Sequence, residues 1–222
     1  MAMAGAIAEA ERNVFLVDDD NDVRGELETA LSLRGFAVQG FGDGEAFLAA
    51  QDALPGGCVV LDLNMPGLSG IDVQTALAER ESAHKVVMLT GSGSIPTAVR
   101  AMHAGAVDFI EKPFGIDELV RAIGRALTQQ RQALREASRR RDAQAQVERL
   151  SERERDVLAG MVLGLANKII AYRLGLSVRT VETYRAHVMD KLAVRSLAEA
   201  VQIAIDADLA PRGDILRTDP AA

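Results

Sequence analysis

The fold is decided by the stretch Cys58–Gly67, which reads CVVLDLNMPG. A short apolar run that stops at a Pro-Gly turn predicts a buried parallel strand with an abrupt end, and Asp62 lies at that end. Ligands of open α/β sheets bind outside the carboxyl ends of the strands. The carboxylate of Asp62 is therefore expected to lie at a ligand crevice.

A second apolar run, Val14–Val17, ends in the same way at the three carboxylates Asp18–Asp20. Several carboxylates brought to one edge of a sheet repel one another unless a cation binds there. The two strand ends together predict a divalent-metal site in which one carboxylate stays free for chemistry.

Two further strand ends carry groups that suit a phosphoryl group. Thr90 follows the run Val86–Leu89 and offers a hydroxyl donor, and Lys112 follows Phe109–Glu111 and offers a point charge. Phosphorylation of a carboxylate brings a dianionic group towards an anion, so such help is required.

The chain from residue 13 to about 127 alternates apolar runs with amphipathic stretches. The expected strands are Val14–Val17, Ala37–Phe41, Cys58–Leu61, Lys85–Leu89 and Asp108–Ile110, and the expected helices are 22–34, 44–51, 69–82, 96–104 and from 116 onward. Pro96 suits a first helical turn. Five β/α repeats predict an α/β fold, a parallel five-stranded sheet covered by helices on both faces.

The segment from about 116 to 150 contains no strong helix breaker except Gly124 and is rich in helix-forming residues after Leu127. A heptad pattern that is apolar at first weakens along the segment. Two interpretations stay open, a solvated linker helix and a short dimeric coiled coil. The run Arg139–Arg141 is interpreted as solvated surface.

The pattern after Ser151 is all-helical, with four expected helices that open at Ser151, Asn167, Ser177 and Ser196. The second and third have the shape of a helix-turn-helix. On the third, Thr180, Glu182, Thr183, Arg185 and Ala186 are expected to face outward, and Val181, Tyr184, Val188 and Leu192 inward. A plain four-helix bundle has the same periodicity, so this alternative stays open.

Composition sets further bounds. The 222 residues are 48% hydrophobic, enough for a core, and no segment approaches the roughly 18 apolar residues that span a membrane. The single cysteine, Cys58, is expected to be a buried small hydrophobe rather than a catalyst. Residues 13–116 carry 6 basic and 15 acidic side chains, and residues 151–207 carry 8 and 7. We expect a cytoplasmic protein with an acidic, cation-binding first half and no membrane partner.

At this point the chain resembles the receiver domain of two-component response regulators. The matching set is Asp18-Asp19, Asp62 with Asn64–Gly67, Thr90 and Lys112–Phe114, in the family's order and spacing. The resemblance implies a flavodoxin-like (βα)5 fold, with Asp62 accepting a phosphoryl group from a sensor histidine kinase. It implies Mg²⁺ bound by Asp18, Asp19, Asp62 and Asn64, a switch formed by Thr90 and Phe109, and Lys112 on the phosphoryl group. Asp20 receives no role.

The helical segment resembles a LuxR-type DNA-binding domain through Leu150–Leu158, Gly164–Ala171, Leu176–Glu182 and His187–Leu192. A receiver joined to this module is similar to the NarL/FixJ family, nearer the FixJ branch. The resemblance implies phosphate contacts by Asn167, Lys168, Arg179, Thr180 and Lys191, and base contacts by Glu182, Thr183 and Ala186. Two interpretations of Glu182 stay open. It accepts a hydrogen bond from a cytosine amino group, or it forms a solvated ion pair with Arg179 or Arg185.

The resulting prediction is a response regulator transcription factor rather than an enzyme. Its expected partners are a cognate sensor histidine kinase, double-stranded DNA, RNA polymerase and, on phosphorylation, a second copy bound through residues 95–111. Expected boundaries are a disordered tail 1–12, a receiver 13–127, a helical linker 128–149, a four-helix LuxR-type domain 150–208 and a disordered tail 209–222.

Three other functions were weighed. A Mg²⁺-dependent phosphohydrolase usually needs a second acid two residues after its nucleophile, where this chain has Asn64. A LuxR-type regulator gated by a small molecule would lack the Asp, Thr and Lys set. A receiver that dimerises without phosphorylation is the more serious rival.

Overall fold

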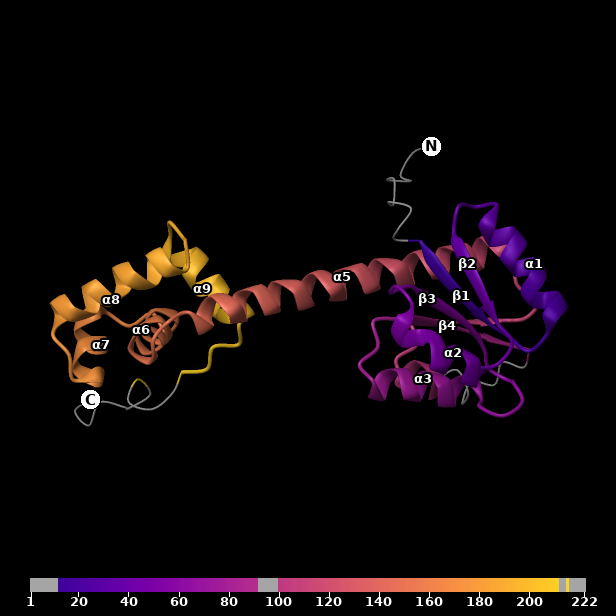
Figure 1. Ribbon diagram of the computed structural model, residues 1–222, viewed down its shortest axis with the longest axis horizontal. Coiled ribbons are helices and arrows are strands. Elements are labelled where there is room, and N and C mark those ends of the chain that lie inside the picture. Colours follow the sequence, from indigo (N-terminus) through magenta and orange to yellow (C-terminus); the bar gives the residue numbers. More distant parts are fainter. Residues whose placement is uncertain (1–11, 92–99, 212–214, 216–222) are drawn as a thin grey trace. The chain divides into compact units, whose positions relative to one another are not determined.

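The computed structural model describes residues 12–91, 100–211 and 215 (Figure 1). The chain forms two compact units, residues 1–134 and 135–222. The long helix α5, Ile116–Glu148, contributes residues to both.

The N-terminal unit is a parallel five-stranded sheet in the order β2-β1-β3-β4-β5. This confirms the predicted α/β class. The strands are β1 Asn13–Val17, β2 Ala37–Phe41, β3 Cys58–Asp62, β4 Lys85–Thr90 and β5 Asp108–Glu111. The helices are α1 Asn21–Ser32, α2 Gly44–Ala50, the short 3₁₀ helix η2 Gln51–Ala53 and α3 Gly70–Glu79, followed after β5 by α5.

The helix expected over 96–104 is described only in part. Residues 100–103 are helical, and Pro96 lies outside the described residues. The helix expected to end at 82 ends three residues earlier, because Glu81 adopts a left-handed backbone with φ 49° and the amide of Ser82 turns back to the Leu77 carbonyl.

Two apolar layers, one on each face of the sheet, form the core of this unit. Alternate strand residues point to opposite faces, so Leu16 and Val60 pack with α1 and α5, whereas Val59 and Leu61 pack with α2 and α3. Cys58 is fully buried in the first layer, and this burial raises the pKa of its thiol. Cys58 is therefore the buried hydrophobe that was predicted.

The register of the sheet brings four strand ends to one edge. Val17 pairs with Leu61, so Asp18 and Asp62 follow on neighbouring strands. The amide of Lys112 donates to the Thr90 carbonyl at 2.7 Å, which joins the ends of β4 and β5. The pairing of the strands therefore brings residues that are far apart in the sequence together at this edge.

The C-terminal unit contains the end of α5 and four further helices: α6 Glu152–Val162, α7 Asn167–Leu174, α8 Val178–Lys191 and α9 Leu197–Asp206. The starts match the prediction, and those of α6, α8 and α9 have a serine cap as a local signal, whereas α7 has no capping side chain. Ser151 and Glu154 form a capping box, and Gly175 ends α7 in the left-handed conformation at φ 67°. The core includes Val157, Leu158, Ile170, Val181, Val188 and Leu192.

The structure departs from the expected tails at three described residues. The Arg12 carbonyl accepts from the Ala37 amide, and the Leu209 amide donates to the Ala204 carbonyl. Ile215 is fully buried against the helical core, and its carbonyl accepts a 2.7 Å hydrogen bond from Arg173. The composition of the tail concealed this contact, because the isolated pair Ile215-Leu216 carries no periodic signal.

None of the helices within the described ranges combines the length and the apolar character that crossing a membrane requires.

Candidate functional site

Asp62 ends β3 at the carboxyl edge of the sheet and is buried, with 6% of its surface exposed. One carboxylate oxygen, Oδ2, accepts from the Asn64 amide at 2.8 Å, and the other, Oδ1, accepts from the Lys112 ammonium at 2.6 Å. Both oxygens are therefore fixed in direction before any ligand arrives.

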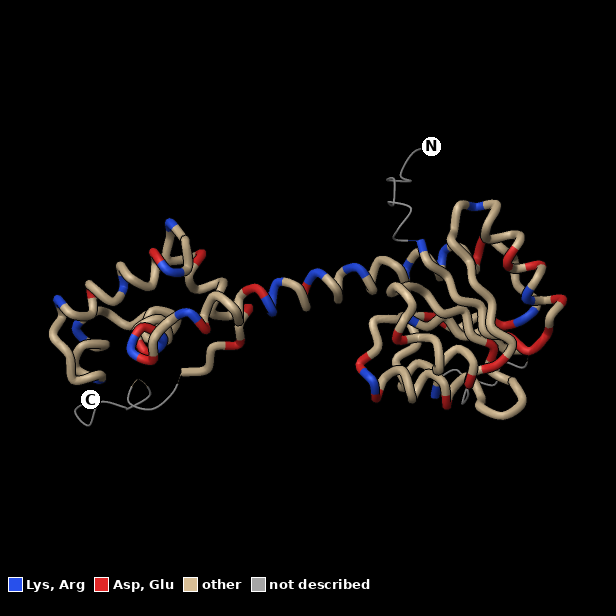
Figure 2. Tube along the Cα trace, in the orientation of Figure 1, with Lys and Arg blue, Asp and Glu red and all other residues tan. Residues whose placement is uncertain are grey.

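Asp18 lies beside it at the end of β1 and is equally buried. Its Oδ1 accepts from the Asp20 amide at 2.9 Å, and its Oδ2 accepts from Lys112, also at 2.9 Å. Asp18 and Asp62, 44 residues apart in the sequence, thus share one ammonium group. Figure 2 shows in red the acidic positions of the loop between β1 and α1.

Lys112 reaches this pair from the end of β5, with 26% of its side chain exposed. Burial alone would lower the pKa of Lys112, but hydrogen bonds to Asp62 and Asp18 outweigh it and raise the pKa. The ammonium is therefore charged, and two carboxylates against one cation leave the cluster with a net charge of −1. A site of this sign attracts a further cation.

The donors near this cluster fit a hard divalent cation, because carboxylate and carbonyl oxygens are the ligands that Mg²⁺ prefers. The predicted ligands Asp18 and Asp62 lie together, and Asn64 is joined to Asp62, whereas the side chain of Asp19 is exposed. Within the described part of the chain, no three acidic, histidine or cysteine side chains are gathered closely enough to hold a metal ion. In this conformation Lys112 takes the carboxylate oxygens instead.

Thr90 lies on β4, the strand next to that of Asp62, and Phe109 lies on β5, the edge strand beyond it. Thr90 ends β4 and is fully buried. Phe109 lies on β5 opposite Met88, half-buried, and packs on the apolar layer beneath α2 and α3. The structure places both beside the acidic edge, as the sequence predicted, and shows them in one conformation.

Two residues of this region received no role from the sequence. Asp20 caps α1, since its side chain accepts from the amides of Asp22 and Val23. An aspartate just before a helix is a standard capping signal, so this role was readable. Arg24 donates to the Asp18 carbonyl at 2.6 Å and also to the Asn21 side chain. No pattern in the sequence predicts this contact.

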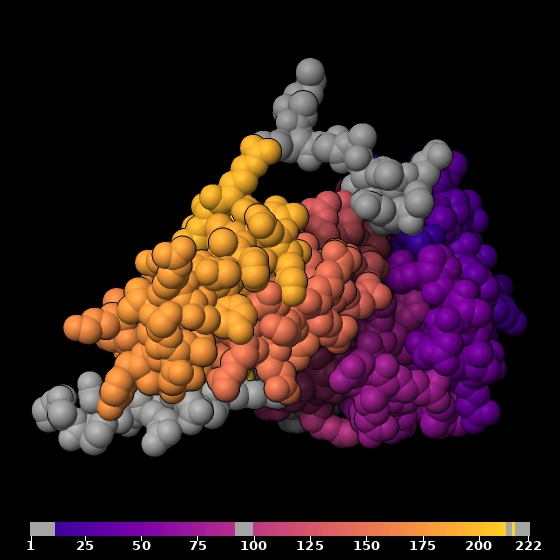
Figure 3. Space-filling model, turned by 60° about the vertical axis from the view of Figure 1, so that its left-hand side comes forward, coloured from indigo at the N-terminus to yellow at the C-terminus, as the bar shows by residue number. Residues whose placement is uncertain are grey.

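The second candidate region is α8, which lies at the surface of the C-terminal unit (Figure 3). Val181, Val188 and Leu192 are buried and Tyr184 is half-buried against the same core, so the predicted inner face is confirmed. The outer face exposes Arg179, Glu182, Thr183, Ala186 and Lys191.

The remaining predicted DNA contacts lie near the start of α7 and α8. Lys168 is exposed and Asn167 half-buried in the first turn of α7. The hydroxyl of Thr180 lies 2.8 Å from that of Ser177, whose side chain also caps α8. The Thr183 hydroxyl donates to the Arg179 carbonyl at 3.1 Å. The two hydroxyl groups are therefore engaged within the helix.

Lys191 has a partner that the sequence did not reveal. Its ammonium donates at 2.7 Å to Glu154, which is 3% exposed and belongs to the capping box of α6. Burial raises the pKa of Glu154, but hydrogen bonds from Lys191 and Ser151 outweigh it and lower the pKa to about 2. Lys191 thus pairs with a buried carboxylate while 44% of its side chain stays exposed, and its expected phosphate contact stays a prediction.

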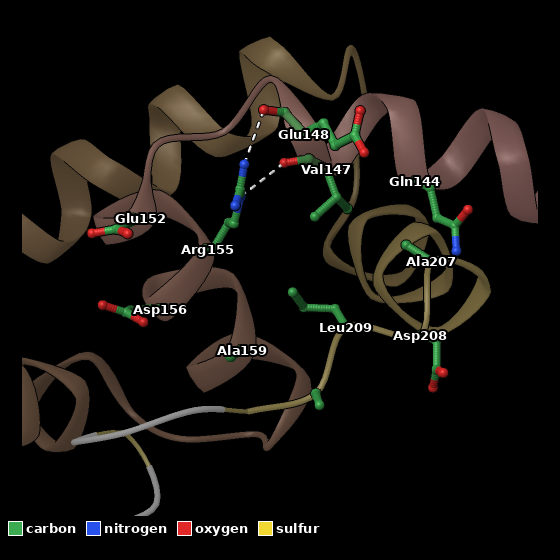
Figure 4. A pocket seen from close by; sticks show the side chains of 11 residues that line it. Gln144, Val147, Glu148, Glu152, Arg155, Asp156, Ala159, Ala207, Asp208 and Leu209 are labelled. Atoms are coloured by element: carbon green, nitrogen blue, oxygen red, sulfur yellow. Dashed lines mark hydrogen bonds between the residues drawn. The ribbon is translucent and has the colours of Figure 1, made fainter.

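A cleft of about 590 Å³ lies in the C-terminal unit between the end of α5, α6 and the end of α9. Figure 4 shows Val147 above it and Leu209 below it, with Arg155 to their left, hydrogen-bonded to the carbonyls of Val147 and Glu148. None of the residues that line it belongs to α7 or α8. The cleft is thus separate from the predicted DNA contacts.

The parallel sheet with its acidic edge and the four-helix unit with its exposed α8 define a class of protein, a response regulator with a LuxR-type DNA-binding domain. Comparison with known families agrees. The Response regulator receiver domain family matches residues 14–124, and the family of bacterial regulatory proteins described as luxR matches residues 148–204.

Individual relatives are similar over nearly the whole chain. The transcriptional regulatory protein FixJ of Bradyrhizobium diazoefficiens is 43% identical over 197 residues, which cover 89% of this chain and 96% of that protein. The crystal structure of full-length FixJ from B. japonicum is 42% identical over 89% of this chain and 98% of its own, with a TM-score of 0.55. The response regulator StyR gives a TM-score of 0.75 at 38% identity, covering 87% and 98%. The chain belongs to the NarL/FixJ family of two-component response regulators.

Proposed function

We propose that this protein is a transcription factor switched by phosphorylation of Asp62. The phosphoryl group comes from a phosphohistidine of a sensor histidine kinase: the P–N bond breaks, and a P–O bond forms to a carboxylate oxygen of Asp62. The observation that carries the proposal is the convergence of Asp62, Asp18 and Lys112 from three different strands within hydrogen-bonding distance.

The residues of this chain would hold Mg²⁺ through Asp18, Asp19, Asp62 and the Asn64 carbonyl. When bound, the ion neutralises charge on the phosphoryl oxygens. Lys112 already carries a raised pKa, so its ammonium stays charged and can move from the carboxylates to the new phosphoryl oxygens. The Asn64 amide orients Asp62 throughout.

The proposed switch consists of Thr90 and Phe109. The Thr90 hydroxyl turns toward the acyl phosphate, and Phe109 turns inward behind it. Phe109 is only half-buried on the edge strand β5, so an inward turn gains apolar burial. The two conformations must differ by no more than a few kcal/mol for the modification to shift their populations.

The output is a dimer that binds DNA at paired half-sites. Residues 95–111 form the proposed dimer face; positions 95–99 lie outside the described residues. In the LuxR-type domain, Glu182, Thr183 and Ala186 on the exposed face of α8 are the proposed base contacts, and Asn167, Lys168, Arg179 and Thr180 the proposed phosphate contacts.

The proposed organisation is a receiver over 13–127, a helical linker over 128–149 and a DNA-binding domain over 150–208. The linker belongs to the single continuous helix α5. RNA polymerase is the proposed partner at the promoter, and the cytoplasm, where the DNA lies, is the proposed location. The family relatives are transcriptional regulators, and we propose no turnover of external substrates.

The decisive experiment compares the wild-type chain with Asp62→Asn. The molar mass and the affinity for promoter-length DNA are measured with and without a small acyl phosphate plus Mg²⁺. We expect the wild type to dimerise and bind DNA more tightly after treatment, and the variant to do neither, because an amide cannot accept the phosphoryl group. An unchanged dimerisation constant of the wild type after treatment would refute the proposal. Asp52→Asn, an exposed aspartate of the same unit, is the matched control.

A further inference from the structure

Arg24, in the second turn of α1, reaches back toward the acidic edge of the sheet. Its Nη1 donates to the Asp18 carbonyl at 2.6 Å, and its Nη2 donates to the Asn21 side chain. The side chain is half-buried. It therefore ties the start of α1 to the main chain of a residue in the proposed phosphorylation site.

The path of this side chain depends on a glycine in the neighbouring strand. A Cβ atom at Gly40 of β2 would lie 2.9 Å from Cδ of Arg24 and would also collide with the Glu28 carboxylate. At Gly42 the nearest atom to an added Cβ is Nη1 of Arg24, at an ordinary 4.0 Å. A side chain at Gly40 would therefore force the Glu28 and Arg24 side chains to shift, whereas one at Gly42 would not.

Arg24 completes the fixing of Asp18, whose polar atoms all have partners. The amide donates to the Phe41 carbonyl, Oδ1 accepts from the Asp20 amide, Oδ2 accepts from Lys112, and the carbonyl accepts from Arg24. Four carboxylates crowd residues 18–22. Their mutual repulsion favours a spread loop, and a guanidinium with two fixed acceptors opposes that spreading.

We propose that Arg24 is a positioning residue of the phosphorylation site. By holding the Asp18 carbonyl, it keeps the Asp18 carboxylate directed at Lys112 and Asp62. It acts through Asp18 and does not touch the phosphoryl group. The inference rests on the proposed function for its consequence, but the structural link can be tested without it.

The test uses five variants of the full chain, three that alter the Arg24 contact and two controls. Arg24→Gln removes the charge and the reach, Arg24→Lys keeps the charge with a single nitrogen, and Gly40→Ala leaves the arginine but blocks its path. Gly42→Ala is the matched glycine control. Arg34→Gln is the matched arginine control, because Arg34 also donates to a main-chain carbonyl, that of Ala30.

The first measurement is amide hydrogen exchange of Asp20 in metal-free protein, since that amide donates to Asp18 Oδ1. Loss of a charged hydrogen bond is expected to speed its exchange by about tenfold in Arg24→Gln and Gly40→Ala. Both controls should match the wild type. The core amides of β1 and β3 should exchange at the wild-type rate in every variant.

The second measurement is the Mg²⁺ dissociation constant by calorimetry. Groups that orient a metal ligand typically change metal affinity by 10–100-fold when removed, so we expect about tenfold weaker binding in Arg24→Gln. Arg24→Lys should recover part of the loss, because it keeps the charge but lacks the planar two-nitrogen fork by which Arg24 reaches the Asp18 carbonyl and the Asn21 side chain together.

Three outcomes would overturn the inference: unchanged Asp20 exchange in Arg24→Gln, full recovery by Arg24→Lys, or core amides that lose protection by the same factor as Asp20. Full recovery would mean that charge alone matters, and uniform loss would mean a purely structural role. A wild-type chain that takes up no phosphoryl group would refute the proposed function, while the Asp20 measurement on metal-free protein would still decide the role of Arg24.

Discussion

Each unit of the protein holds buried carboxylates with a lysine, but the two arrangements differ in their charge balance. In the helical unit, one carboxylate, Glu154, receives Lys191 at 2.7 Å and both the amide and the hydroxyl of Ser151. In the receiver, two carboxylates, Asp18 and Asp62, divide a single ammonium between them.

The charge balance separates a structural ion pair from a reactive one. The Glu154 pair is neutral and its hydrogen bonds are satisfied, so it has no reason to recruit a ligand. The Asp18 and Asp62 cluster keeps one negative charge beside the open edge of a sheet, so it gains by binding a cation. A buried carboxylate that has its own counter-charge stabilises the fold. Two carboxylates that share one counter-charge remain available for chemistry.

The largest expected effect tests the balanced pair. Lys191→Met should destabilise the helical unit by about 3–5 kcal/mol, because it leaves Glu154 buried without its counter-charge. Both tyrosines, Tyr172 and Tyr184, belong to this unit and the chain has no tryptophan, so tyrosine emission during urea unfolding reports on it alone.

Lys168→Met, which removes an exposed lysine of α7, is the control and should shift the unfolding midpoint little. If Lys191→Met unfolds at the wild-type urea concentration, the Ser151 hydrogen bonds and the His187 imidazole, 3.9 Å from Glu154 Oε1, hold Glu154 without the lysine. The contrast between the two units would then lose its basis.

A smaller effect is expected from pH. The pKa of Glu154 falls from 4.5 to about 2 on folding, so its stabilising contribution is complete above pH 4.5 and disappears as the pH falls toward 2. The shift corresponds to a contribution on the order of 3 kcal/mol at most. The measurement is the urea midpoint of tyrosine emission between pH 6 and pH 2.

Glu154→Gln supplies the comparison for this titration, because an amide does not ionise. Its midpoint should change less over the same pH range. Identical curves for the two proteins would show that other carboxylates cause the acid sensitivity.

The smallest net effect is expected at Lys112 when Mg²⁺ is present. Lys112→Met leaves Asp18 and Asp62 without their cation, and metal-free protein should lose protection of the β3 amides against hydrogen exchange. Mg²⁺ at about 100 times its dissociation constant returns about 2.7 kcal/mol. Mg²⁺ should therefore restore most of the protection that Lys112→Met loses, whereas it should not rescue Lys191→Met.

Lys85→Met, at the start of β4 and half-buried, is the control in the same unit. A loss of protection in Lys112→Met that Mg²⁺ leaves untouched would show that the receiver lysine is as structural as Lys191.

The elements of both units were predictable because their signals are local. Five apolar runs ended where the structure ends its strands, within one residue at either end, and the capping residues Ser151 and Ser177 marked helix starts. The tails were less predictable: Ile215 is held by a tertiary contact with Arg173. The positions of four residues were predictable because each lies at the end of a strand or directly after it, and the topology of a parallel sheet brings such ends to one edge: Asp18, Asp62, Thr90 and Lys112.

The hydrogen-bond partners of two basic side chains could not be predicted from the sequence. The resemblance to LuxR-type domains implies a phosphate contact for Lys191, but nothing in the sequence predicts its hydrogen bond to Glu154, 37 residues away. Arg24 looked like an ordinary helix residue, yet it reaches Asp18 over Gly40. The Lys191 contact depends on the packing of α8 against α6. The Arg24 contact depends on the space beside Gly40, which has no Cβ.

The sequence by itself determined the class of fold, the family and the order of the reactive strand ends, because hydrophobic period, capping and turn residues act over a few positions. Only the tertiary structure decided which lysine is shared by two carboxylates and which is matched to one. That decision is made by distances between segments far apart in the chain, and such distances carry no local sequence signal.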